Sequence, residues 1–99
     1  VKTDAARAIK INARDNCAVL LTEVKKGEPV EVRADEGTMC LVARCAIASG
    51  HKIALVSLAV DQPIIKYGEE IGRAQSAIAA GDWIHLHNVY CRRGHETRT

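Results

Sequence analysis

The sequence contains very few aromatic residues. Among its 99 residues there is no phenylalanine, and Phe, Trp and Tyr together make up 3% of the chain. Proteins that bind single-stranded nucleic acid stack the bases on aromatic side chains, and that platform is missing here. The charge argues against nucleic acid as well, because residues 1–90 carry 11 Lys/Arg and 11 Asp/Glu, without the excess of basic residues that such binding requires. The net charge of +2 comes from the last residues, where Arg92, Arg93 and Arg98 outnumber Glu96.

Long apolar runs are missing too. No stretch approaches the roughly 18 consecutive apolar residues of a membrane-spanning helix, so we expect no membrane partner. A chain that is 47% hydrophobic and 26% charged has the composition of an ordinary globular domain. We expect one domain over residues 1–91 and a polar, mobile tail over residues 92–99.

The four cysteines form no CxxC pair. Structural zinc sites are commonly built from such pairs, so their spacing gives little support for zinc. Cys17 lies inside the apolar run Cys17–Leu21. The pattern favours buried, reduced thiols in a cytoplasmic protein. The four residues are Cys17, Cys40, Cys45 and Cys91.

One short pattern recurs four times. It consists of an apolar residue, two intervening residues, Gly or Asp, two variable residues, and then Val or Ile. The first residue would fill the core, and Gly, or Asp as second choice, would adopt the left-handed conformation that other residues resist. The copies are too short and uneven for a solenoid, so they predict tight turns within one β fold. They are Val24–Val30, Ile47–Ile53, Leu58–Ile64 and Ile78–Ile84.

The segments between these turns are rich in Val, Ile and Leu, and Gly, Pro, Asp or Asn bound them, as is typical of strands. Many short strands with closely spaced turns predict a mainly β, compact, barrel-like or clip-like fold. Short helical turns are expected at Leu20–Lys25 and Ala46–Ser49, and a helix over Met39–Ala48 is the main alternative. The expected strands are Ala8–Asn12, Cys17–Leu21, Pro29–Arg33, Thr38–Ala43, Lys52–Ser57, Ile64–Lys66, Glu70–Ala74 and Trp83–Val89.

The last expected strand is the most informative segment for chemistry. Alternation along a strand places Trp83, His85 and His87 on one face, with Ile84 and Leu86 in the core. Two histidines at this spacing have Cα atoms about 6–7 Å apart. That separation suits two ligands of one metal, or two hydrogen-bond donors to an anionic substrate, and two surface histidines are the alternative. Two ligands do not complete a metal site, so a third would come from elsewhere or from another chain.

Two further segments offer candidate binding residues. His51 and Lys52 directly follow Gly50, and a glycine lets the backbone approach a ligand closely. The pair would provide a proton-transfer group and an anchor for an anion. Lys66 and Tyr67 precede a Gly at an expected tight hairpin, where they would hold a carboxylate or a hydroxyl. A solvated turn is the alternative in both places.

Two acidic segments are better explained by local structure. The segment Arg14-Asp15-Asn16 is expected to form an Asx turn that starts a strand. Asp35 and Glu36 are adjacent carboxylates, and adjacent residues in an extended chain point to opposite faces. We therefore expect a solvated turn there and not a catalytic acid pair.

Taken together and in order, these segments resemble a known family. The resemblance is carried by Asp15-Asn16-Cys17-Ala18, GHKIAL at 50–55, IIKYGEEIGRA at 64–74 and GDWIHLHNV at 81–89. They are similar to the N-terminal domain of altronate and galactarate dehydratases, a module that also occurs as a free small subunit in sulfolactate sulfo-lyases. The module belongs to the SAF group of β-clip domains, and the match covers roughly residues 9–90. Cys17 departs from it, since the family usually has Val there.

The resemblance implies the small subunit of a hydro-lyase of the altronate dehydratase type. Such an enzyme is a carbon–oxygen lyase that removes water from a sugar acid, with a large subunit supplying much of the site. A divalent metal shared with that partner, iron in the dehydratases, would stabilise the enediolate charge. Without its partner the chain would be inactive or nearly so. The alternatives are the small subunit of a sulfolactate sulfo-lyase and a non-catalytic SAF-like module that binds a sugar acid or a protein. Self-association into a homo-oligomer stays open.

Residues of this chain that fall on the family's motifs are implied to form the site. The implied catalytic residues are His51, His85 and His87, and of these His85 and His87 would also contact the metal. The implied substrate-binding residues are Lys52, Lys66, Tyr67 and Asn88, with Lys52 or Lys66 on the substrate carboxylate. The sequence does not identify the base or the particular acid.

Overall fold

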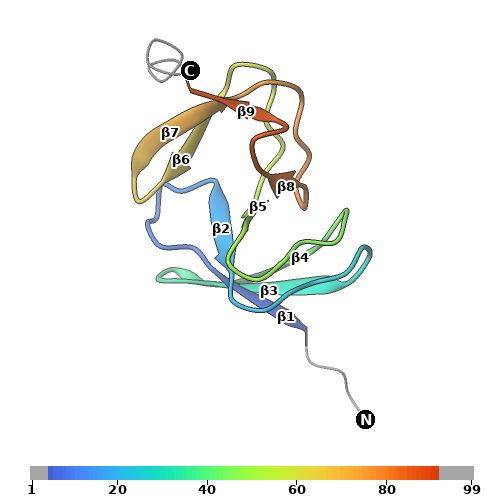
Figure 1. Ribbon diagram of the computed structural model, residues 1–99. Helices are drawn as coiled ribbons and strands as arrows, with labels where there is room; N and C mark the ends of the chain where they lie inside the picture. Colours follow the sequence, from blue (N-terminus) through green and yellow to red (C-terminus); the bar gives the residue numbers. More distant parts are fainter. Residues whose placement is uncertain (1–4, 92–99) are drawn as a thin grey trace.

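A computed structural model describes residues 5–91, which form strands, turns and connecting loops (Figure 1). In this part of the chain there is a six-stranded sheet with the order β4-β3-β1-β2-β5-β8 and a three-stranded sheet with the order β6-β7-β9. The prediction of a mainly β fold is therefore confirmed. The strands are β1 Ala6–Ile9, β2 Cys17–Leu20, β3 Pro29–Ala34, β4 Gly37–Val42, β5 Lys52–Ala54, β6 Pro63–Lys66, β7 Glu69–Ala74, β8 Trp83–Ile84 and β9 Val89–Tyr90.

The predicted helical turns at Leu20–Lys25 and Ala46–Ser49 are wrong. Val24 and Ile47 instead form an isolated antiparallel bridge, in which each backbone N–H donates to the other's carbonyl at 2.9 Å. Backbone groups that a helical turn would pair locally are therefore paired between the two segments. Within residues 5–91 the structure contains no helix that could span a membrane. The tail predicted over residues 92–99 lies outside the described residues.

The four predicted turns have the predicted geometry. Gly27, Gly50, Asp61 and Gly81 all adopt positive φ, between 73° and 95°. Each apolar residue at the start of the pattern is buried, with at most 6% of its surface exposed. Leu58 and Ile78, which begin the third and fourth copies, form the same kind of bridge as Val24 and Ile47. Gly, or Asp in its place, thus marks the turns because the turn backbone requires the left-handed region.

These turns divide the fold into two similar halves that share β5. In the first half one turn leads from β2 into the β3–β4 hairpin and another leads on to β5. In the second half one turn leads from β5 into the β6–β7 hairpin and another leads on to β8. The hydrogen bonds repeat as well, since Gly27 donates to the Ala43 carbonyl and Asp61 donates to the Ala74 carbonyl, each at 2.8 Å.

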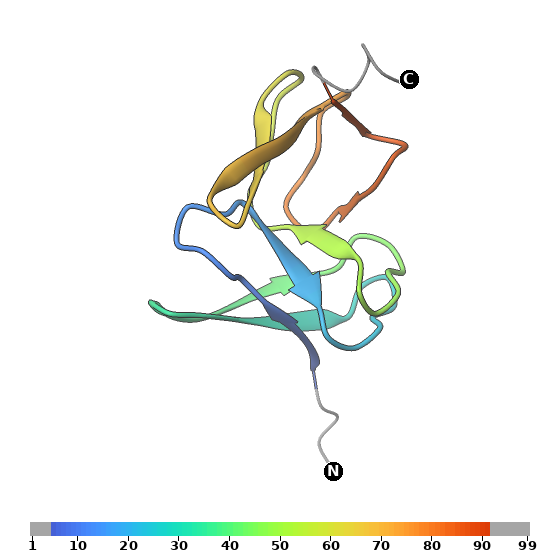
Figure 2. The same cartoon turned by 60° about the vertical axis from the view of Figure 1, so that its left-hand side comes forward.

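Strands β2, β5 and β8 lie between two hydrophobic clusters. Figure 2 shows β2 and β5 in the middle of the molecule, with the β3–β4 hairpin on one side and the β6–β7 hairpin on the other. Ala18 and Leu20 of β2 belong to the cluster that includes residues of β1 and β3, whereas Cys17 belongs to the cluster that includes residues of β6 and β7. The alternation of side chains along β2 therefore joins the two halves of the core.

The single strand predicted over Trp83–Val89 is wrong. Strand β8 ends at Ile84, and β9 belongs to the other sheet, so residues 85–88 form a turn that crosses between the sheets. The turn closes with a 3.0 Å hydrogen bond from the Asn88 N–H to the His85 carbonyl. Leu86 lies in this turn with 80% of its surface exposed, and not in the core as predicted, whereas Ile84 is buried as expected.

Candidate functional site

Three histidines gather around the indole ring of Trp83. The His85 ring stacks on it with a centroid distance of 4.7 Å, and the His87 ring lies at 5.1 Å. The His51 ring meets its edge at 5.5 Å. The centroids of His85 and His87 are 6.5 Å apart, and those of His51 and His85 are 5.3 Å apart. The structure therefore brings together all three histidines that the sequence singled out.

Two strands and one turn position this group. Trp83 lies in β8, at the edge of the six-stranded sheet, and pairs with Ile53 of β5. His51 directly precedes β5, and His85 and His87 lie in the turn after β8. His51 and His85 are half-buried and His87 is exposed. The imidazoles therefore lie at a sheet edge, where a substrate or a second chain can reach them.

His51 has a different role in its turn from the equivalent residue of the other three copies. In those copies the side chain after the positive-φ residue accepts a hydrogen bond from a backbone N–H of the same turn. The side chains are Glu28, Gln62 and Asp82, with distances of 3.0, 2.6 and 2.7 Å. The Nδ1 atom of His51 instead accepts the indole N–H of Trp83 at 3.2 Å. In a neutral imidazole this leaves Nε2–H as a free donor.

Asn88 supports the turn that carries the other two histidines. Its side chain is buried, its Oδ1 atom accepts the His85 N–H at 3.0 Å, and its Nδ2 atom donates to the Trp83 carbonyl at 2.8 Å. These bonds stabilise the turn against the extended strand that the sequence predicted. Both ends of the amide are therefore already bonded within the fold.

The histidines carry donor atoms of a kind that suits a metal ion. Imidazole nitrogens are suitable ligands for iron and zinc, so His85 and His87 fit as two donors. Residues 5–91 contain no group of three or more His, Cys, Asp or Glu that could hold an ion. A metal at this pair would therefore need its remaining ligands from another chain or domain.

A second group of candidate residues lies at the tip of the β6–β7 hairpin. Tyr67 and Gly68 form its two-residue turn with φ values of 58° and 77°, so the glycine has the predicted positive φ. The Nζ atom of Lys66 lies 4.8 Å from the centroid of the Tyr67 ring. The Tyr67 side chain is exposed. We call residues 66–68 the tip.

Asp15 and Asn16 attach this hairpin to the larger sheet. Asp15 is buried, and its two carboxylate oxygens accept the N–H groups of Gly68 at 2.8 Å and Asn12 at 3.0 Å. The Asn16 side chain accepts the N–H of Ile65 at 2.8 Å and donates to the carbonyl of Pro63, which also belongs to β6. The Asx turn predicted for residues 14–16 lies slightly earlier, because it is made by Asn12, whose Oδ1 accepts the Arg14 N–H. Asp15 was missed as a site residue, since sequence alone does not show which hairpin packs against it.

The charges of Lys52 and Lys66, which belong to different sheets, both act on the buried thiol of Cys17. The pKa of this thiol is raised to about 11, first by burial and then by the Asp15 carboxylate, while the charges of Lys52 and Lys66 oppose the rise. Lys52 pairs with Ile84, which belongs to the same cluster as Cys17. Lys52 is the first residue of β5 and His51 directly precedes that strand, so a joint site at the GHK turn stays a prediction.

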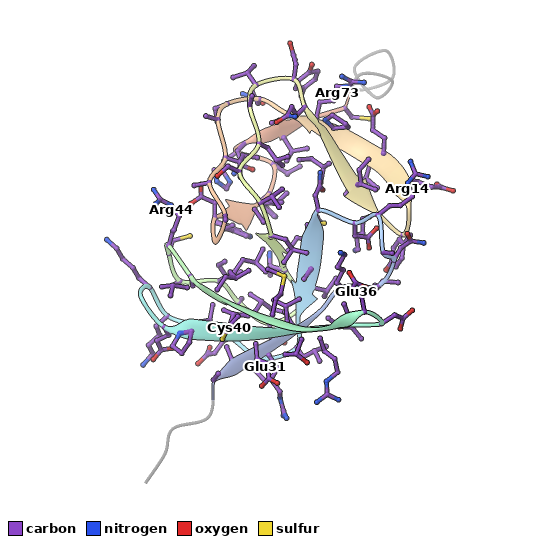
Figure 3. All side chains as sticks on the ribbon, turned by 180° about the vertical axis from the view of Figure 1, so that it is seen from behind. Arg14, Glu31, Glu36, Cys40, Arg44 and Arg73 are labelled. Atoms are coloured by element: carbon purple, nitrogen blue, oxygen red, sulfur yellow. The ribbon has the colours of Figure 1, made fainter. Side chains whose placement is uncertain are left out.

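The acidic pair at 35–36 forms the solvated turn that the sequence predicted. Asp35 and Glu36 are both exposed and connect β3 to β4, where Ala34 pairs with Gly37. Figure 3 shows Glu36 at this end of the hairpin. Its carboxylate accepts a 2.8 Å hydrogen bond from Lys10, which lowers the pKa of Glu36. The two carboxylates therefore belong to an exposed turn and do not form a catalytic acid pair.

The prediction of buried thiols holds for Cys17 and is wrong for Cys40 and Cys91, which are exposed. We expect iodoacetamide at pH 9 to alkylate Cys40 readily and to leave Cys17 unmodified in the folded protein. A pKa of about 11 keeps the Cys17 thiol protonated at that pH, and its reactive thiolate forms only as the pH approaches that value. Mass spectrometry of tryptic peptides measures both sites, with urea-unfolded protein as the control. Equal labelling in the folded state would contradict the burial.

The chain is similar in sequence to one domain of two known dehydratases. A family model described as the altronate/galactarate dehydratase SAF domain matches residues 6–92. Altronate dehydratase of Escherichia coli (strain K12) is 46% identical over 81 residues, which are 82% of this chain and 16% of that protein. Galactarate dehydratase (L-threo-forming) of the same organism is 35% identical, over 84% of this chain and 15% of that protein. The chain thus spans only a small part of these dehydratases.

A shorter relative matches over most of its own length. The (2R)-sulfolactate sulfo-lyase subunit alpha of Chromohalobacter salexigens is 35% identical over 85 residues, which cover 83% of this chain and 90% of that protein. The similar module therefore occurs both within long proteins and as most of a short, separate subunit.

Proposed function

The chain belongs to the altronate/galactarate dehydratase SAF domain family, and from this we propose that it is the small subunit of a hydro-lyase that removes water from a sugar acid. The proposal includes a large dehydratase subunit that completes the site. The observation that carries it is the group of three histidines around Trp83 at an open sheet edge. His51 supports it further, because its side chain does not make the bond that the other three turns use.

The proposed reaction needs a base for the proton α to the carboxylate and an acid for the departing hydroxyl. The Nδ1 atom of His51 accepts the Trp83 N–H, so we assign the Nε2–H of His51 a hydrogen bond to the leaving oxygen, while the proton that turns the departing hydroxyl into water would come from an acid of the large subunit. His85 and His87 would contact the metal or the substrate. A divalent metal bound there, iron by analogy with the family, would supply Lewis-acid stabilisation of the charge that develops on the substrate.

Lys52 and Lys66 are our candidates for binding the carboxylate of the acid. Neither forms an ion pair with an acidic residue in the described part of the chain. Tyr67 would contact the same acid. A substrate contact by Asn88 stays a prediction, since its amide already supports the turn. The cytoplasmic location expected from the cysteines also stays a prediction.

A sulfo-lyase small subunit is a second candidate function. The length match supports it, because the chain covers 90% of a relative named as subunit alpha of a sulfolactate sulfo-lyase. Its reaction would share the first step of the hydro-lyase reaction, removal of the proton α to the carboxylate. It would differ in the leaving group, which is sulfite in place of water.

The test is to co-express the chain with a large dehydratase-type chain and to assay the purified mixture. We expect a stable complex that loses water from altronate or galactarate, or releases sulfite from sulfolactate, and that loses its activity with a metal chelator. The chain alone should be inactive or nearly so. A failure of the large chain to bind, with no turnover in the mixture, would leave a non-catalytic binding module.

A further inference from the structure

Tyr67 has a backbone conformation that its residue type disfavours. Its φ is 58°, in the left-handed region, where the Cβ atom of an L-residue crowds the following carbonyl. Two-residue hairpin turns with this geometry prefer Asn-Gly or Asp-Gly. The ring does not contribute to the core, because 57% of the residue is exposed. Neither the turn nor packing explains why a tyrosine is found here, and strained residues of this kind concentrate at functional sites.

The Tyr67 ring orients the neighbouring ammonium group. The Nζ atom of Lys66 lies 4.8 Å from the ring centroid, within the range of a cation–π contact. A lysine with no acidic partner among residues 5–91 would otherwise sample many rotamers. The contact keeps the charge at the tip, where an incoming anion can meet it.

Asp15 holds the tip in place from the loop that precedes β2. Its Oδ1 atom accepts the Gly68 N–H at 2.8 Å, while its Oδ2 atom ties the carboxylate to Asn12. A Cβ added at Gly68 would lie 3.0 Å from the Asn12 side chain, so the loop before β2 packs directly on the tip. The carboxylate is 5% exposed and makes no ion pair within residues 5–91. Its bonds therefore go to the backbone of the tip and of its own loop.

We propose that the tip is a rigid recognition site for the oxyanion group of the substrate, a carboxylate or a sulfonate, and that Asp15 is its positioning residue. The proposal rests on the proposed function for its substrate and deepens it. The strain at Tyr67 is retained because the ring fixes Lys66. Asp15 acts on the substrate only through the tip, so it is not itself a catalytic residue.

The first test is Tyr67→Asn, which suits the turn better and removes the ring. We expect the melting temperature to rise by about 4 °C, on the scale for a domain of this size, while the KM of the assembled enzyme rises about tenfold, equivalent to a binding loss of about 1.4 kcal/mol. The kcat should change less than twofold. A KM equal to that of the wild type would overturn the role of the tip.

The second test is Asp15→Asn, which keeps the size of the side chain and replaces one acceptor with a donor. We expect a lower melting temperature together with the same rise in KM. The control is Val32→Ala, which removes buried apolar atoms from the hydrophobic cluster around β1 and β3. This variant should lower the melting temperature with no change in KM. If Asp15→Asn also lowers the melting temperature without changing KM, Asp15 only stabilises the fold and has no positioning role.

A binding experiment separates this proposal from the proposed function. Galactarate, sulfolactate and sodium sulfate are titrated into the 99-residue chain while the backbone amides of residues 66–68 are followed by NMR. Shifts that saturate in wild type and are lost in Tyr67→Asn support the tip, even if no partner gives turnover. Because sulfolactate carries both groups, sulfate and galactarate decide between them: shifts with sulfate and not with galactarate would assign a sulfonate, and shifts with galactarate and not with sulfate a carboxylate. The absence of shifts with all three, together with an unchanged KM in Tyr67→Asn, overturns the site.

Discussion

Replacing His85 and His87 together by alanine should lower the kcat of the assembled enzyme at least about 100-fold, the scale of positioned acid–base or metal-binding groups. The chain should remain folded, because Asn88 and backbone hydrogen bonds hold the turn. The lost contacts with Trp83 should cost about 1 kcal/mol each or less. Steady-state kinetics on the sugar acid measures the first effect and thermal unfolding the second.

The matched control for this prediction is Leu86→Ala, which lies between the two histidines in the same turn. Leu86 is 80% exposed, so its truncation removes no core contact and should leave both kcat and stability unchanged. Wild-type turnover in the double histidine variant would mean that the imidazoles only cover the indole. The proposal would then lose the observation on which it depends.

The sequence predicted that the two histidines lie together, but for a reason that the structure replaces. Alternation along a strand was expected to place His85 and His87 on one face, but the strand ends at Ile84 and both histidines lie in the turn before β9. Both rings lie against Trp83, which brings them close within a turn. Whether an apolar residue such as Leu86 enters a core depends on where the next strand pairs, and a short-range pattern does not contain that information.

The turns were predictable because their requirement is local. A positive φ selects Gly or Asp from the backbone alone, and the apolar residue three positions earlier is buried in all four copies. Asp15 shows the opposite case. Its carboxylate bonds to the N–H of Gly68, which is 53 residues away in the chain and lies in the turn between β6 and β7. No local pattern distinguishes such a residue from the solvated Asp35.

The same reasoning predicts that two glycines in equivalent turns will respond differently to alanine. Both Gly50 and Gly81 have positive φ, 88° and 95°, so either substitution strains the backbone by about 1–2 kcal/mol. A Cβ at Gly50 would meet nothing within 4 Å, whereas a Cβ at Gly81 would lie 2.3 Å from the Val42 carbonyl oxygen. That oxygen is backbone and cannot rotate away. Relieving the overlap requires β4 or the turn to shift, at a further cost of about 1–3 kcal/mol or more.

Gly81→Ala should therefore lower the free energy of unfolding by at least about 3 kcal/mol, against about 1–2 kcal/mol for Gly50→Ala. The shift would also disturb two backbone bonds of Gly81, from the Arg44 N–H to its carbonyl and from its own N–H to the Ala54 carbonyl. A domain of ordinary stability has about 5–15 kcal/mol in total, so the loss at Gly81 takes a large share of it. Urea unfolding of the two variants measures the difference. Equal losses would mean that only the left-handed backbone matters, and that the contact between the fourth turn and β4 is looser than a 2.3 Å approach implies.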